Sequence, residues 1–118
     1  MQNTPCLPHH RLYAFGVARE LLIAVRDARI RSCSLRDQAL RAATSVCLNC
    51  CGRRRARDAG RQRADKARAF TVARGEAVEA AAAVEIAAVL GDASDEDAQR
   101  VAVLVDRIVG MLTRLIRP

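Results

Sequence analysis

Three cysteines lie close together near the middle of the chain, at a spacing that can bind a metal or support redox chemistry. Cys47 and Cys50 are separated by two residues, and Cys51 follows directly. Positions three apart share one face of a helix, so two thiolates could hold one zinc ion. A zinc site would need two further ligands. The candidates are Cys6, His9 and His10.

Packing is the competing interpretation of these cysteines, and we favour it. A redox C-x-x-C motif normally begins a helix, where the helix dipole lowers the pKa of the thiol. This motif would end a helix, and small apolar side chains suit the core of a helical bundle. We also expect both histidines to be solvated, because no carboxylate or thiol lies at helical spacing from them. The sequence therefore predicts no metal and no cofactor.

Motifs that carry catalysis are not found in the sequence. It contains no GxxxxGK[ST], HExxH or GxSxG pattern and no pair of acidic residues at catalytic spacing. We therefore expect a protein that is not an enzyme.

The strongest charge feature is a basic segment at residues 53–68. The net charge of +7 is unevenly distributed, because residues 1–74 hold 16 basic residues against 5 acidic and residues 75–118 hold 4 against 8. The basic residues of the segment are Arg53, Arg54, Arg55, Arg57, Arg61, Arg63, Lys66 and Arg68. Such blocks attract phosphate backbones or acidic protein surfaces. No aromatic residue lies among them, which predicts poor readout of single strands.

The composition predicts an all-α fold. Hydrophobic residues make up 51% of the chain, but aromatics only 3% and tryptophan is absent, so the core must be aliphatic and alanine-rich. No apolar run approaches the ~20 residues needed to cross a membrane. No secretory signal is recognisable, and an odd number of cysteines suits the reducing cytoplasm. We expect a cytoplasmic protein.

Four helices joined by short connections are predicted, forming an antiparallel up-down-up-down four-helix bundle over residues 10–118 after an N-terminal arm at residues 1–9. The first helix spans about residues 10–29. Ser34 with Asp37 predicts a cap and a second helix from Leu35. A long third helix follows Gly60 and ends at Gly91. Ser94 then caps a fourth helix that runs to about residue 116.

Apolar residues at spacings of three and four predict the buried stripes. In the first helix these are Leu12, Phe15, Leu22 and Val25. In the third they are Phe70, Ala73, Ala77, Ala81, Val84 and Ala88. In the fourth they are Val101, Leu104, Ile108, Leu112 and Leu115. A polar stripe of Gln38, Arg41, Ser45 and Asn49 follows one side of the second helix, and the pattern alone favours an exposed face.

An ordered series of residues supports a family resemblance. Its first part is Leu35, Gln38, Arg41, Ala42, Ala43, Ser45, Val46 and Asn49. Its second part is Phe70, Ala73, Arg74, Gly75, Glu79, Ile86, Ala87, Leu90 and Gly91. Over about residues 12–116 the chain resembles the small four-helix-bundle proteins first noticed as reading frames within 23S rRNA intervening sequences. It departs from them at residues 50–53 and at Glu76, so the acidic residue usual in the former stretch has no counterpart here.

The resemblance implies a bundle that assembles as a ring, typically a homopentamer, without enzymatic activity. Similar proteins are accessory subunits of diversity-generating retroelements, which bind a reverse transcriptase and associate with its RNA and DNA. With this family in view, we predict a partly buried ion pair between Arg41 and Glu79. We also predict that Asn49 satisfies backbone groups where the second helix ends.

Three functions are left open by the sequence. The first is a nucleic-acid-associated accessory or scaffold protein, acting through the basic segment, with a reverse transcriptase as its candidate partner. The second is a protein-interaction module of the intervening-sequence type with no direct nucleic-acid role. The third, which the sequence supports least, is a metal- or redox-responsive protein that uses Cys47, Cys50 and Cys51.

Overall fold

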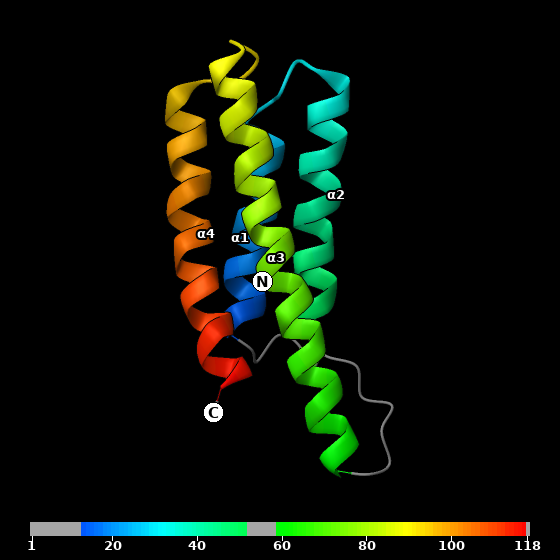
Figure 1. Ribbon diagram of the computed structural model, residues 1–118. Helices are drawn as coiled ribbons and strands as arrows, with labels where there is room; N and C mark the ends of the chain where they lie inside the picture. Colours follow the sequence, from blue (N-terminus) through cyan, green and yellow to red (C-terminus); the bar gives the residue numbers. More distant parts are fainter. Residues whose placement is uncertain (1–12, 52–58, 118) are drawn as a thin grey trace, which may run out of the picture.

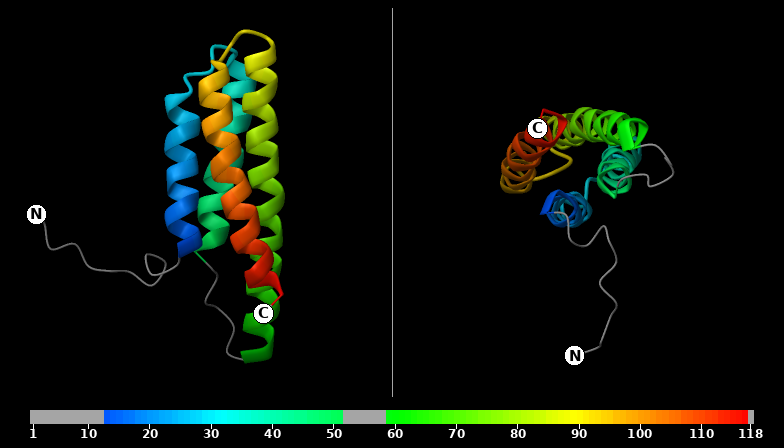
Figure 2. Two further views of the ribbon diagram at one scale, coloured as in Figure 1. Left: turned by 90° about the vertical axis from the view of Figure 1, so that its left-hand side faces the viewer. Right: turned by 90° about the horizontal axis from the view of Figure 1, so that it is seen from below.

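Four helices pack side by side in the computed structural model, which describes residues 13–51 and 59–117, with side chains described for all of these except residues 59–63. The helices are α1 (Tyr13–Asp27), α2 (Cys33–Cys50), α3 (Ala59–Val89) and α4 (Asp95–Ile116). Each helix packs against two others, in the order α1, α2, α3, α4 and back to α1. Consecutive helices run in opposite directions in Figure 1, and the end view in Figure 2 shows them around one core. The prediction of an all-α four-helix bundle is confirmed.

The core is unequal in composition from helix to helix. α2 and α3 contribute mainly alanines, including Ala39, Ala42, Ala73 and Ala77, all fully buried. α1 and α4 contribute most of the large buried side chains. These are Leu21, Val25, Val101, Ile108 and Leu112. Small side chains let helix backbones approach closely, and the larger ones fill the remaining space.

The predicted stripes are partly wrong in register. In α3, Ala80 and Ala87 are fully buried, whereas the predicted Ala81 and Ala88 are only half-buried. Phe70, Ala73, Ala77, Ala80, Val84 and Ala87 follow spacings of three and four in alternation, as in a heptad seam, and Ala69 and Ala83 are buried beside them. The prediction placed two spacings of four in succession, which carried the stripe too far round the helix.

The stripes of α1 and α4 need similar corrections. In α4, Leu115 is exposed and Val105 is buried instead. In α1, Phe15 and Leu22 are only half-buried, whereas Val25 is buried as predicted. The centre of the α1 stripe is formed by Val17, Ala18 and Leu21 instead. Leu12 and the predicted arm at residues 1–9 lie outside the described residues.

The start of α2 also differs from the prediction. Ser32, not Ser34, is the N-cap, and its hydroxyl accepts a hydrogen bond from the Leu35 backbone N–H at 3.4 Å. α1 ends at Asp27, because Arg29 turns the chain with a φ of 46°. Ile30 is then fully buried and fixes the connection against the core. The chain is therefore placed to enter the helix two residues earlier than local sequence indicated.

The connection between α3 and α4 is as predicted. Gly91 has a φ of 79°, which favours glycine, and its N–H donates to the Ala88 carbonyl at 3.0 Å. The Asp92 N–H donates to the Ala87 carbonyl at 2.7 Å, which completes a Schellman motif. The Ser94 hydroxyl caps α4 by accepting from the Asp97 N–H at 3.1 Å. Both predicted helix ends are confirmed.

The third helix is much longer than its neighbours. At a rise of about 1.5 Å per residue, the 31 residues of α3 span about 46 Å, against about 27 Å for the 18 residues of α2. Figure 1 shows the first turns of α3, in green, extending past the ends of the other helices. Among the described residues, no helix has the length and apolarity required to cross a membrane. Several of the predicted basic residues lie on this extension of α3.

Candidate nucleic-acid and partner surface

The predicted basic segment divides into two parts. Arg53, Arg54, Arg55 and Arg57 lie outside the described residues. The backbones of Arg61 and Arg63 lie in the first turns of α3, and Lys66 and Arg68 follow one to two turns later. Lys66 is half-buried and Arg68 is exposed. Half of the predicted basic residues therefore lie on or next to the extension of α3.

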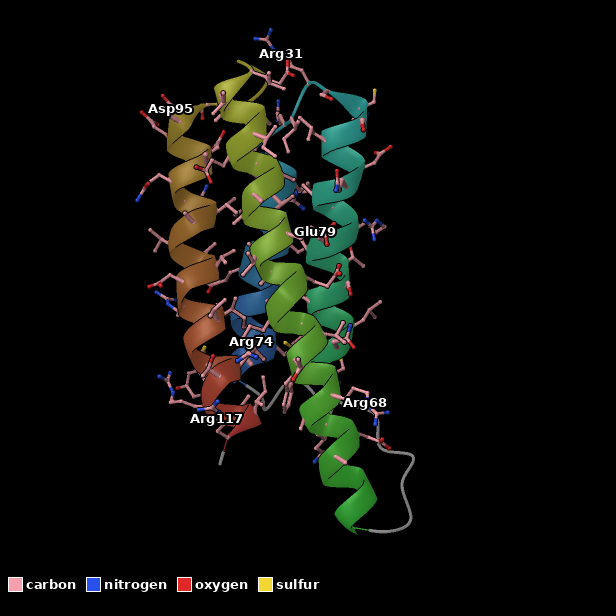
Figure 3. All side chains as sticks on the ribbon, viewed as in Figure 1. Arg31, Arg68, Arg74, Glu79, Asp95 and Arg117 are labelled. Carbon is pink, nitrogen blue, oxygen red and sulfur yellow. The ribbon has the colours of Figure 1, made fainter. Side chains whose placement is uncertain are left out.

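Packing adds basic residues that sequence reasoning missed. The end of α4 lies beside the first half of α3, and the guanidinium of Arg74 donates to the Thr113 hydroxyl at 3.2 Å. Figure 3 shows Arg68, Arg74 and Arg117 towards one end of the bundle, and Asp95 and Arg31 at the other. Residues 59–74 and 107–117, which we call the basic end, hold eight basic residues and one acidic residue. The predicted alternation of helix directions was the signal that could have found this grouping.

The other ends of α3 and α4 are acidic, although Arg29 and Arg31 of the α1–α2 connection lie beside Asp92 and Asp97 there. Residues 85–97 hold five acidic residues and no basic residue. Asp95, Glu96 and Asp97 lie in the first turn of α4, where they stabilise the positive end of the helix dipole. The chain is therefore electrostatically polar along these two helices, and an anionic partner is attracted to the basic end.

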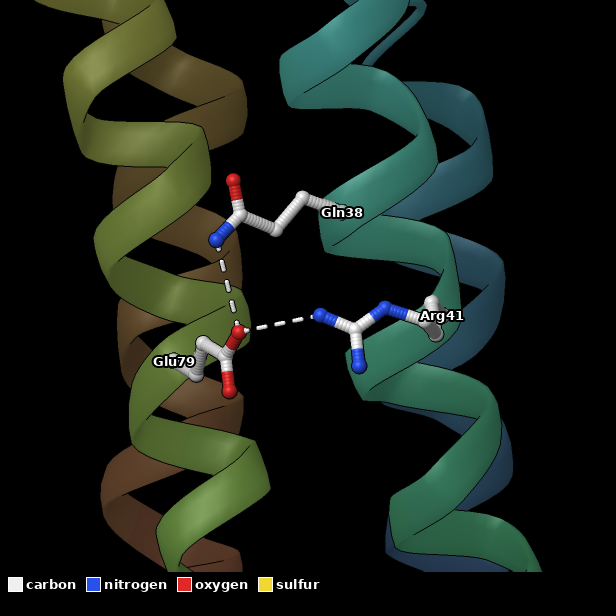
Figure 4. Close-up of polar contacts among 3 residues, drawn as sticks. All are labelled: Gln38, Arg41 and Glu79. Atoms are coloured by element: carbon white, nitrogen blue, oxygen red, sulfur yellow. Dashed lines mark hydrogen bonds and ion pairs between the residues drawn. The ribbon is translucent and has the colours of Figure 1, made fainter.

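The polar stripe of α2 provides a contact between helices (Figure 4). Arg41 Nη2 lies 3.4 Å from Glu79 Oε1, and Gln38 Nε2 donates to the same oxygen at 3.4 Å. The predicted ion pair is thus present. Its burial is smaller than predicted, because the Arg41 side chain is 66% exposed and that of Glu79 is 35% exposed. Such pairs contribute at most about 1 kcal/mol, so this contact aligns α2 with α3 rather than forming a reactive site.

Asn49 lies apart from that contact, near the end of α2. Its side-chain amide donates to the Ser45 carbonyl at 2.9 Å and to the Ser45 hydroxyl at 3.2 Å. The Ser45 carbonyl lies within α2 and not among the unpaired carbonyls of its last turn, so the predicted capping role at the helix end is not observed. With Arg41 and Ser45 it also lines a hollow of about 650 Å³ whose walls all come from α2. A hollow formed by one helix is a surface groove, as the polar pattern indicated.

Of the three clustered cysteines, Cys50 packs in the core, whereas Cys47 and Cys51 are half-buried. Cys50 is fully buried in the core, and burial, with smaller effects of the neighbouring Cys47 and Cys51, raises its pKa to about 12. Burial also raises the pKa of Cys47 to about 11. The Cys51 thiol donates to the Cys47 carbonyl at 3.3 Å. Within residues 13–51 and 59–117 no cluster of three metal-binding side chains occurs, and Cys6, His9 and His10 lie outside that range. Protonated, buried thiols are poor nucleophiles and poor metal ligands.

The burial of Cys50 predicts a loss of stability in alkali. Above pH 9 the thiol ionises in the unfolded chain, while the folded chain keeps its proton up to a pKa of about 12. The folded state then binds more protons, so the free energy of unfolding falls by about 1.4 kcal/mol per pH unit across that window. Urea unfolding between pH 8 and pH 11 measures this slope. Cys47 adds to this slope between pH 9 and pH 11, since its pKa is also raised, to about 11. Cys50→Ala is therefore expected to make the slope shallower without removing it, whereas Cys33→Ala, which removes an exposed thiol, should leave it unchanged. Parallel curves for all three proteins would contradict the assignment.

α3 is apolar on two opposite faces. One face forms the core seam, and the other carries Val72, Val78, Ile86 and Val89, all exposed. Gly75 and Ala82 lie in the same outer stripe at helical spacing. We call these six residues the outer face of α3. Exposed apolar patches of this kind mark interaction surfaces.

Comparisons with known proteins add no family. No protein-family model matches the chain, and no curated protein matches it. The resemblance to the intervening-sequence bundles therefore stays a prediction based on the residues that carry it.

Proposed function

We propose that this protein is a non-enzymatic accessory or scaffold protein that binds nucleic acid through the basic end and assembles as a homo-oligomer through the outer face of α3. The observation that supports nucleic-acid binding is the gathering of eight basic residues and one acidic residue at that end. They come from α3 and α4, so the folded chain concentrates charge that the sequence separates. A cytoplasmic location agrees with the odd number of cysteines.

Phosphates are the groups that this surface fits. Arg68, Arg114 and Arg117 are exposed, and guanidinium groups bind phosphate oxygens in pairs. Contacts with the phosphate backbone carry no sequence information and release counterions, so binding should be non-specific and steeply dependent on salt. This suits an accessory role rather than that of a sequence-specific regulator.

Assembly would multiply the basic surface. A homo-oligomer presents one basic end per chain, and linked sites bind a polymer far more tightly than one site does. The family resemblance implies five chains and a reverse transcriptase of a diversity-generating retroelement as the protein partner. We include the five chains and the reverse transcriptase partner in the proposal. Measuring the mass of the assembly tests the number of chains.

Neutralising the extension of α3 tests the proposed nucleic-acid binding. The variant replaces Arg61, Arg63, Lys66 and Arg68 with glutamine. For wild type, log affinity for duplex DNA or structured RNA should fall linearly with log salt from about 50 to 200 mM. If all four residues contact phosphates, the variant's slope should be shallower by up to about 4. Gel-shift titration or fluorescence anisotropy measures both.

A matched control removes the same charge from the other end of the helices. It replaces Arg26, Arg29, Arg31 and Arg100 with glutamine. This control should keep most of the wild-type affinity and slope. Equal losses in the two variants would show that net charge alone attracts the nucleic acid. Absence of wild-type binding at about 50 mM salt would overturn the proposal and leave the protein-interaction module as the better interpretation.

A further inference from the structure

We infer that the basic end carries a stacking site for a base of single-stranded nucleic acid, formed by Tyr13 at the start of α1 and Arg114 in the last turn of α4. This inference rests on the proposed nucleic-acid function and adds the strand type and the residues that select it. The two residues are about a hundred positions apart in sequence, and the packing of α1 on α4 brings them to one hollow.

The hollow has the shape that such a site needs. Tyr13, Ala14, Met111, Arg114 and Leu115 line a space of about 300 Å³, at the lower end of the ~300–1,000 Å³ typical of small-molecule sites. Ala14 is buried, whereas Tyr13 is 85% exposed. A large aromatic ring at a helix start, beside an open apolar hollow, offers a flat surface for another ring.

The charges around the hollow favour a nucleotide over a neutral aromatic ligand. Arg114 lies in the last turn of α4 and Arg117 is its C-cap, whereas Arg107, further back on α4, is paired with Glu20 of α1 at 3.7 Å. The first turn of α1 has no acidic residue, and the positive dipole end of α1 at Tyr13 offsets the negative dipole end of α4 beside it, so the arginines decide the sign of the potential. A phosphate beside Arg114 therefore meets positive potential while the attached base lies on Tyr13.

Single strands are the form that this arrangement selects. In a duplex the bases are already stacked on each other, whereas in a single strand a base can turn out and stack on an aromatic side chain. The sequence predicted poor single-strand readout, because no aromatic residue lies within residues 53–68. The fold places the one tyrosine of the chain beside an arginine from another helix, which supplies the missing ring.

The single tyrosine gives a direct spectroscopic test. The chain has one tyrosine and no tryptophan, so tyrosine emission reports on Tyr13 alone. The titrants are an oligothymidylate of about 12 nucleotides and an abasic deoxyribose-phosphate oligomer of equal length and charge. The oligothymidylate should quench the emission and bind more tightly. The abasic oligomer should bind through its phosphates alone, with little quenching.

Variants separate stacking from charge. Because the Tyr13 variants remove the only tyrosine, binding is followed by the fluorescence anisotropy of dye-labelled oligomers. Tyr13→Ala should weaken oligothymidylate binding about 5- to 150-fold while leaving the abasic oligomer unchanged. Tyr13→Phe keeps the ring and should bind as wild type does. Arg114→Gln should weaken both oligomers alike. Tyr13 is largely exposed, so its truncation should leave the helical circular dichroism intact.

The outcomes distinguish this inference from the proposed function. If both oligomers bind equally and Tyr13→Ala changes neither, the stacking site is wrong while nucleic-acid binding stands. Binding of duplex alone would likewise overturn the stacking site and leave nucleic-acid binding in place. If neither oligomer nor duplex binds, the stacking site and the proposed function fail together.

Discussion

Leu21→Ala is expected to lower the free energy of unfolding by about 3–5 kcal/mol. Leu21 is fully buried at the centre of the α1 stripe. The cost has two parts. One is the free energy gained when the side chain is transferred out of water, which is lost, and the other is the cavity left behind. The cavity should collapse little here, because α2 and α3 contribute mainly alanines, which have no longer side-chain rotamers that could fill it. We therefore expect the upper part of the usual range.

Urea unfolding followed by far-ultraviolet circular dichroism measures this effect. Wild type and variant must be compared at one chain concentration, since self-association stabilises the folded state by mass action. Leu48→Ala is the matched control, because it removes the same atoms from an exposed position on α2. Its effect should lie within about 0.5 kcal/mol. A similar small effect for Leu21 would mean that α1 is not part of the packed core.

Helix ends were predictable where local chemistry decides them. Gly91 and Ser94 act within a few residues of chain, through a positive φ and a hydroxyl cap, and both predictions are confirmed. The prediction that Ser34 caps α2 was wrong, because contacts with residues distant in the sequence decide where the helix begins. Either serine can cap a helix, and the choice of Ser32 follows from Ile30, whose burial against distant residues fixes where the chain enters α2.

The register of the core was predictable only where side chains differ in size. The run of four alanines at residues 80–83 carries no periodic signal, since every position is equally small and apolar. Contacts with α2 and α4 decide that Ala80 is fully buried and Ala82 exposed. A sequence pattern cannot contain this information.

The candidate surface was likewise predictable only where its residues lie close together in the sequence. The basic segment was visible because its residues are contiguous, and half of them lie outside the described residues. The hollow at Tyr13 was not visible, because its walls come from the first and last helices. The ion pair of Arg41 with Glu79 was found through the family resemblance, since spacing alone favoured a solvated face.

Ile86→Glu is expected to dissociate the proposed homo-oligomer into single chains. Ile86 is 50% exposed and lies within the outer face of α3. Burying a carboxylate against apolar side chains without a partner costs several kcal/mol, and the cost recurs at every copy of the interface. Light scattering or sedimentation velocity measures the mass. Wild type should give a multiple of the chain mass, fivefold if the resemblance holds, and the variant the mass of one chain.

Val103→Glu on α4 is the matched control, since Val103 is 53% exposed and has the same apolar character. It should retain the wild-type mass, and both variants should keep wild-type helicity because both positions face solvent in the single chain. A monomeric wild type, or an Ile86→Glu variant of unchanged mass, would contradict assembly through α3. Because the two positions are almost equally exposed in one chain, a difference between their variants can arise only from a second chain covering one of them.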